Sequence, residues 1–198
     1  MKLLKEILET AMVAAFLKAE LPSARFGDEL KKAMNALGVA ESIISEPNVE
    51  NETENELRAR VLGSYRGYRQ NRQIFQGFPA DLSWYEAELA REEIGGLHYV
   101  DYSYWNELSD HTHLVKNAVA NINKGKIIFN MSNDRFLAVA EDIRHGQHDF
   151  EPMIVWGESK APVLTILEGH LRATAFGLAG ENAPATIKVI VGLSDQPQ

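Results

Sequence analysis

The sequence predicts an α/β protein with a compact core of mixed sheet and helices, preceded by a helical lobe. Two observations predict this class. Through most of the first hundred residues apolar side chains recur at helical spacing, whereas the last third alternates short β-prone runs with amphipathic segments. The 198 residues are 45% hydrophobic and 24% charged, enough for one sizeable core or a core with an added lobe. We therefore expect a helical lobe over 1–96 and an α/β domain over 97–198.

The expected lobe begins with a helix over 2–19, where Leu4, Leu8, Ala11 and Ala15 follow a helical period. Further elements of the lobe are expected as follows: a helix over 28–37 stopped by Gly38, a polar acidic loop over 45–55, and a helix over 54–69.

The middle of the chain combines turn signals with aromatic residues. Residues 76–79 (Gln-Gly-Phe-Pro) read as a turn, and 83–86 (Ser-Trp-Tyr-Glu) have the form of a capping box that starts a helix to Ile94. A short β-prone run at 97–101 precedes a loop at 105–110. If a nucleotide binds nearby, the aromatic side chains here could stack on its base, although aromatic burial is the simpler interpretation.

The last third reads as alternating helices and strands. In order we expect a helix over 112–123, a strand at 127–129, a helix over 133–145 capped by Ser132 or Asn133, strands at 153–156 and 163–167, a helix over 170–178 and a strand at 186–191.

The stretch at 163–175 is the strongest candidate for a functional site. A buried strand stops at Gly169 and passes directly into a helix whose first turn carries His170 and Arg172. The first backbone N–H groups of such a helix have no partner within the helix and favour an anion. Arg172 could add a forked cationic donor, so the stretch predicts a phosphate site.

The order of elements over roughly 127–192 resembles the superfamily of ParB N-terminal domains, sulfiredoxins and free serine kinases. Four runs carry the resemblance. They are Leu137-Ala138-Val139-Ala140-Glu141-Asp142-Ile143-Arg144 before Pro152-Met153-Ile154-Val155, then Glu168-Gly169-His170-Leu171-Arg172-Ala173-Thr174-Ala175, then Ile187-Lys188-Val189-Ile190-Val191. The Gly-x-x-Arg motif alone is weak evidence for this superfamily, but its place in the order of elements makes it more specific.

The resemblance implies a site for the phosphates of ATP, ADP or CTP with Mg²⁺. Its candidate contact residues are Gly169, His170, Arg172 and Thr174, and Glu168 is the candidate base or Mg²⁺ ligand; a strand-end carboxylate that faces water is the alternative. His170 stands where sulfiredoxin has its cysteine, which excludes peroxiredoxin repair, and Leu171 replaces an expected phosphate donor. The reaction class implied is phosphoryl transfer or nucleotide hydrolysis.

Two other functions remain open. The chain could be a non-catalytic interaction protein that keeps this fold and binds a partner or a second copy through the helical lobe. It could also bind nucleic acid through the arginines and aromatic residues of 58–72, although a solvated face with ion-paired arginines is the simpler interpretation. The net charge of −8 argues against an extended DNA contact, and we expect no operator-binding segment after the last strand.

Composition excludes several other classes. The absence of cysteine excludes thiol catalysis, disulfides and cysteine-ligated zinc, and no apolar run approaches the length of a membrane span. We therefore expect a cytoplasmic protein that does not bind membranes. The histidine pairs His111/His113 and His145/His148 lack a third ligand at a diagnostic spacing, so no metal site is predicted from them.

Overall fold

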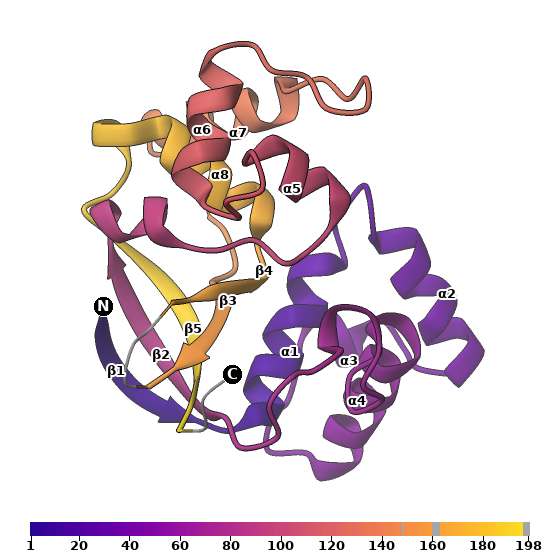
Figure 1. The fold of residues 1–198 in the computed structure, drawn as a ribbon. Helices are drawn as coiled ribbons and strands as arrows, with labels where there is room; N and C mark the ends of the chain where they lie inside the picture. Colours follow the sequence, from indigo (N-terminus) through magenta and orange to yellow (C-terminus); the bar gives the residue numbers. More distant parts are fainter. Residues whose placement is uncertain (148, 160–162, 196–198) are drawn as a thin grey trace. The chain divides into compact units, whose positions relative to one another are not determined.

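The computed structural model describes residues 1–147, 149–159 and 163–195. Five strands of this part of the chain form one mixed sheet in the order β1-β2-β5-β3-β4. They are β1 (Lys2–Ile7), β2 (Ser83–Ala90), β3 (Met153–Glu158), β4 (Thr165–Glu168) and β5 (Thr186–Ser194), as Figure 1 shows. The sheet and the helices that accompany it confirm the predicted α/β class.

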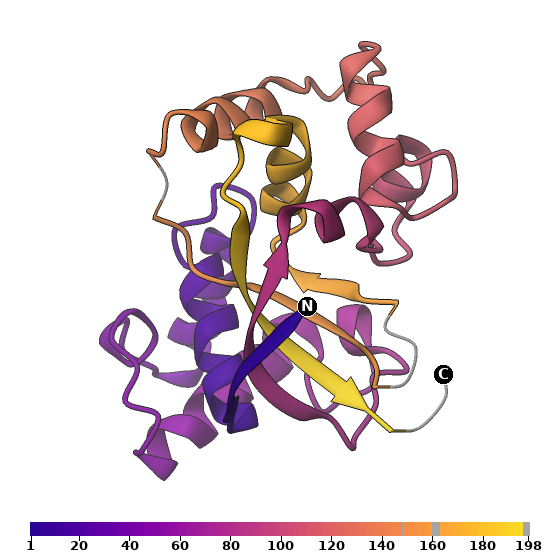
Figure 2. The same cartoon turned by 90° about the vertical axis from the view of Figure 1, so that its left-hand side faces the viewer.

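The register of the sheet brings the end of β4 beside the start of β3. β3 is parallel to β5, with Met153 opposite Val189, and antiparallel to β4, with Ile154 opposite Glu168. β5 lies between β2 and β3, and Figure 2 shows it crossing the middle of the sheet. The last strand in sequence is therefore central in space.

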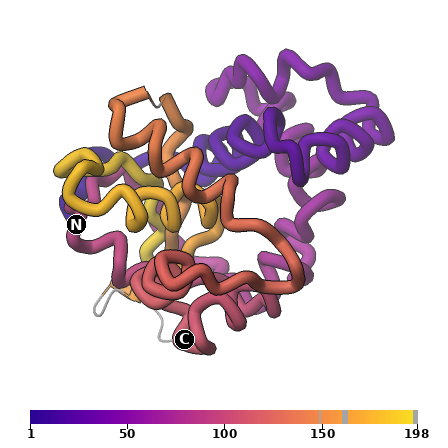
Figure 3. Tube along the Cα trace, turned by 90° about the horizontal axis from the view of Figure 1, so that it is seen from above, coloured from indigo at the N-terminus to yellow at the C-terminus, as the bar shows by residue number. Residues whose placement is uncertain are grey.

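The unit that contains the sheet also contains four α-helices, of which α8 (His170–Ala179) follows β4 directly. The other three are α5 (Ser103–Leu108), α6 (Val115–Asn123) and α7 (Asp134–Arg144), and short 3₁₀ turns lie at Arg91–Gly96 and Gly180–Asn182. Both α6 and α7 contact α8, and in Figure 3 α7 runs alongside α8. α7 buries Phe136, Ala140 and Ile143, which share one face of the helix, whereas Leu137 is exposed.

Residues 7–84 form a separate helical unit. Its elements are α1 (Glu9–Glu20), α2 (Gly27–Leu37), α3 (Ser42–Ser45), α4 (Glu52–Arg66) and a 3₁₀ turn at Gln73–Phe75. The ring of Phe75 lies 6.0 Å from that of Phe16 and 5.2 Å from that of Tyr68, so aromatic packing joins the ends of this unit to α1. Residues 1–6 belong with the chain from Tyr85 onward, a division that differs from the expected boundary at residue 96.

Two expected helices are wrong in part. The first residues of the predicted 2–19 helix form β1, an edge strand next to β2, and the helix begins only at Glu9. The predicted capping box at 83–86 lies in β2, where Trp84, Ala87 and Leu89 are buried in a largely alternating pattern. Pairing within the sheet therefore overrides a local cap signal.

Other expectations for the middle of the chain also change. The expected loop at 105–110 is mostly helix α5. The expected strands at 97–101 and 127–129 contribute only isolated bridges, of His98 with Leu114 and Thr165 and of Ile128 with Met131. Over the described residues, no helix is both long and apolar enough to cross a bilayer.

Candidate functional site

The turn between β4 and α8 depends on Gly169. Its φ is +100°, a region that side chains rarely adopt, and a Cβ added there would lie 2.8 Å from Cγ of Met153 and 3.2 Å from Nη2 of Arg172. Only glycine fits both the backbone conformation and the close approach of Met153. Gly169 is the N-cap residue of α8 and forms no side-chain cap bond to the helix.

The guanidinium of Arg172 is held on two sides. Its Nη2 forms an ion pair with the carboxylate of Glu168, four residues earlier, and its Nη1 donates to the backbone carbonyl of Glu151. The Arg172 and Glu168 side chains are only 11% and 14% exposed. The structure thus brings together two predicted site residues, and the anion beside Arg172 belongs to the protein itself.

His170 lies against aromatic side chains from another part of the chain. Its ring stacks on Trp105, with 5.3 Å between centroids and 18° between planes, and the ring of Tyr99 lies 6.1 Å away. Tyr99 and Trp105 stack on each other at 4.5 Å. The sequence analysis raised this proximity only as a possibility, namely that aromatic side chains of this segment stack on a base near the turn; the structure places Trp105 beside the first turn of α8.

Thr174 lies in the core beneath this stack. Its side chain is 0% exposed, and its hydroxyl donates to the His170 carbonyl at 2.8 Å. Because that hydrogen is used, the hydroxyl of Tyr99, 2.8 Å away, is the donor of the second bond. Burial raises the pKa of the Tyr99 phenol well above its usual range, which keeps this donor protonated. Thr174 thus fixes α8 to the segment at Tyr99.

Leu171 packs, partly buried, against the hydrophobic core. It offers no polar group at the position where the resemblance implies a phosphate donor. The groups that the α8 N-terminus could offer to a phosphate are therefore its backbone N–H groups, the His170 ring and Arg172.

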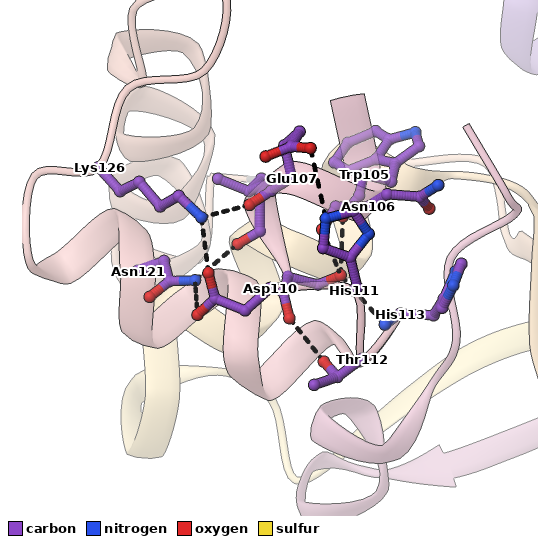
Figure 4. Close-up of polar contacts among 11 residues, drawn as sticks. Trp105, Asn106, Glu107, Asp110, His111, Thr112, His113, Asn121 and Lys126 are labelled. Carbon is purple, nitrogen blue, oxygen red and sulfur yellow. Dashed lines mark hydrogen bonds and ion pairs between the residues drawn. The ribbon is translucent and has the colours of Figure 1, made fainter. Parts of the chain in front are cut away.

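The loop after α5 is a tight polar structure that sequence reasoning missed (Figure 4). Asp110, His111 and His113 adopt φ of 54°, 58° and 59°, which is uncommon for side-chain-bearing residues. The buried Ser109 hydroxyl accepts from the His113 N–H at 3.0 Å and donates to the Trp105 carbonyl at 2.7 Å, which holds the loop to α5. The left-handed conformations are therefore fixed by side-chain hydrogen bonds.

Charged groups complete this loop. Lys126 lies 2.7 Å from Asp110, and Asn121 donates to the same carboxylate at 2.8 Å; these bonds lower the pKa of Asp110. His111 pairs with Glu107 at 3.3 Å. Across the described residues, no three His, Cys, Asp or Glu side chains are arranged to hold a metal ion. Residue 148, half of the second histidine pair, lies outside the described part.

The arginine-rich run 58–72 serves mainly to hold the helical unit together. Arg58 is 0% exposed and donates to the carbonyls of Ile43 and Asn48. Arg66 pairs with the buried Glu20, and Arg72 donates to the carbonyls of residues 63 and 64. The expected solvated face is thus wrong for Arg58, and only part of the run faces solvent.

Comparisons with known proteins do not assign this chain to a family. No protein-family model, no curated protein and no solved structure matches this chain. The resemblance to the ParB and sulfiredoxin superfamily therefore stays a prediction from the sequence.

Proposed function

We propose that residues 168–172 bind the phosphate groups of a nucleotide, of the ATP, ADP or CTP type, together with Mg²⁺. The observation that supports this most is that Gly169, the N-cap residue of α8, makes no side-chain cap and that Arg172 lies in the first turn of the helix. The N-terminal end of a helix and a guanidinium in its first turn are suited to bind a phosphate.

The Glu168–Arg172 ion pair sets a condition for this binding. Glu168 already supplies an anion to Arg172, so a phosphate would have to displace the carboxylate from the guanidinium. The Glu151 carbonyl would still hold the other side of Arg172, which preserves its orientation. A displaced Glu168 would be available to Mg²⁺, which binds through a few carboxylates and substrate phosphates. In phosphoryl transfer or hydrolysis Glu168 would act as this ligand or as the base.

The first test is calorimetric titration of ATP, ADP and CTP with Mg²⁺ into the wild type and an Arg172→Ala variant. We expect a loss of about tenfold or more in affinity in the variant, because a charge-assisted bond to phosphate disappears. Arg144→Ala is the matched control, since Arg144 also pairs with a carboxylate, Glu141, and donates to a carbonyl, that of Leu178. Absence of binding at millimolar nucleotide, or equal loss in both variants, would contradict the proposal.

Glu168→Gln adds a second arm to the same titration. Without Mg²⁺ the variant is expected to bind nucleotide more tightly than the wild type, because the competing carboxylate is gone. With Mg²⁺ this advantage is expected to shrink or reverse, because a metal ligand is also gone. Unchanged affinity in both conditions would show that Glu168 has no part in the site.

A second candidate function is a non-catalytic interaction protein. The observation in its favour is that Glu168 and the Glu151 carbonyl already engage both ends of the Arg172 guanidinium. This alternative predicts no nucleotide binding and a mass in analytical ultracentrifugation that depends on protein concentration. Nucleotide binding lost in Arg172→Ala, with a constant monomer mass, would reject it.

A further inference from the structure

The strand β1 leaves one edge of the sheet without a neighbouring strand. It stands first in the order β1-β2-β5-β3-β4, and Figure 1 shows it at the outer side of β2. Every residue from Lys2 to Glu6 is exposed, including Leu3 at 45% and Leu4 at 47%. Successive side chains of a strand point to opposite faces, so the described residues leave both faces of β1 largely open. Such an edge offers its N–H and C=O groups to another strand.

The charges of β1 are also available to a partner. Lys2, Lys5 and Glu6 alternate with the exposed leucines, and none of the three forms an ion pair within the part of the chain that the structure describes. Lysines alone on an edge strand discourage pairing. Glu6 changes this balance, because it places an anion on the same face of the strand as Lys2.

The order of these charges suits pairing of β1 with a second copy of itself. A symmetric dimer has a two-fold axis, so the residue at the centre of an antiparallel pairing faces its own copy. Two centres, Leu4 and Lys5, keep all but one residue of the six-residue strand paired. Centred on Leu4, the pairing places each Lys2 opposite Glu6 of the other copy. Centred on Lys5, it places two ammonium groups opposite each other, which is unfavourable.

We propose that two copies of this chain associate through β1, antiparallel and centred on Leu4, and so form one continuous sheet. On one face of the joined strands, two Lys2–Glu6 ion pairs flank a contact between the two Leu4 side chains. On the other face, the aliphatic stem of Lys5 covers Leu3 of the other copy. The proposal does not rest on nucleotide binding, because β4, which leads into α8, is at the opposite edge of the sheet.

The first test is analytical ultracentrifugation of the wild type and of charge variants over a range of concentrations. The wild-type mass should rise toward that of two chains. Lys2→Glu and Glu6→Lys are each expected to raise the dissociation constant about tenfold, because like charges then face each other at two places. Lys5→Glu is the matched control, since it changes the net charge as Lys2→Glu does but faces Leu3.

Two outcomes of this test would overturn the proposal. A wild type that stays monomeric up to millimolar concentration would mean that Lys2 and Lys5 protect the edge from pairing. Equal weakening by Lys5→Glu and Lys2→Glu would mean that association responds to net charge and not to this register.

A mixture of the two weakened variants tests the register directly. In the mixed pair, the Lys2→Glu chain supplies two carboxylates and the Glu6→Lys chain supplies two ammonium groups, so opposite charges again face each other at both places. The mixture is expected to associate with about the wild-type affinity, at concentrations where each variant alone is monomeric. A mixture that associates no more tightly than the separate variants would overturn the proposal.

Crosslinking locates the centre of the pairing. The chain has no cysteine, so Leu4→Cys supplies a single thiol. Residues directly opposite in an antiparallel pair have Cα atoms about 4.5–5.5 Å apart, a separation that a disulfide can span. Mild oxidation is expected to link two copies of Leu4→Cys. Leu137→Cys is the control, because Leu137 on α7 is similarly exposed, at 44%. Equal crosslinking of both variants would overturn the assignment.

These experiments separate the proposal from both functions considered above. Arg172→Ala is expected to leave association unchanged, and Lys2→Glu is expected to leave nucleotide affinity unchanged. Association through residues 7–84 would not be rescued by mixing the charge variants, because both substitutions lie outside that unit. Failure of one proposal is thus distinguishable from failure of the other.

Discussion

At the residue scale, the candidate site depends on a few side chains whose environments are unusual. Gly169 combines a positive φ with contact to Met153, and Arg172 is held by Glu168 and by the Glu151 carbonyl. Glu168 and Arg172 are four residues apart, a spacing that allows an ion pair on a helix. The spacing was visible in the sequence, but the structure was needed to show that the strand-end carboxylate turns toward the helix.

Gly169→Ala is expected to lower the free energy of unfolding by about 2 kcal/mol or more. Two effects add: the strain of a positive φ and the displacement of Met153, whose Cγ would lie 2.8 Å from the new Cβ. Gly125→Ala separates the two effects, because Gly125 has a φ of +79° and open space around its Cβ position. Urea unfolding of both variants checks this, and an equal loss would show that the Met153 contact has no cost.

At the element scale, the structure fixes α8 to the segment that precedes α5. The Tyr99 hydroxyl donates to Thr174, and the rings of Tyr99 and Trp105 stack beside His170. This arrangement places the aromatic run near the predicted phosphate site. A contact between segments far apart in the chain leaves no local signal in a single sequence. The helical period of α7 and the glycine that precedes α8 are local signals, so they could be predicted.

Tyr99→Phe is expected to destabilise the protein by about 1 kcal/mol, because the Thr174 oxygen loses a buried hydrogen bond. Thr174→Val is expected to cost more, since it leaves the buried Tyr99 hydroxyl without an acceptor. The double variant should cost less than the sum of the single variants. Thermal unfolding measures all three, with Tyr102→Phe, an exposed tyrosine, as the control. Additive losses would contradict a direct Tyr99–Thr174 interaction.

The elements themselves were predicted with uneven success. The helix at Gly27–Leu37 and the strands after residue 150 follow from apolar period and glycine stops, signals that lie within each segment. β1 and β2 were missed because strand pairing with distant residues decides them. The capping signal at Ser83 is real as a pattern, but burial of Trp84 and Leu89 in the sheet outweighs it.

At the scale of the whole molecule, acidification is expected to lower stability in two steps. Burial and the neighbouring His113 lower the pKa of His98 from 6.5, so the folded state binds fewer protons than the unfolded state as pH falls below about 6.5. Hydrogen bonds from Lys126 and Arg144 lower the pKa values of Asp110 and Glu141 from 3.8 and 4.5. The stabilisation that Asp110 and Glu141 contribute is complete above their pKa values in the unfolded chain. It is lost as the pH falls through their lower pKa values in the folded protein.

The measurement is the thermal midpoint between pH 7 and pH 3 for the wild type and His98→Gln. The variant should lose the first step and keep the second, because only the imidazole is replaced. Asp110→Asn should reduce the acid step and leave the step near neutrality unchanged. Identical slopes for wild type and His98→Gln between pH 7 and pH 5 would contradict this account.

The central place of β5 has a consequence for the order in which the chain folds. Residues 7–84 make their helical contacts within one continuous stretch, so this unit can form early during synthesis. The sheet cannot, because β5 lies between β2 and β3, which precede it in the chain by many residues. Until residues 186–194 have been synthesised, β2 and β3 each expose the edge that β5 later covers, and such unpaired edges can pair with other chains.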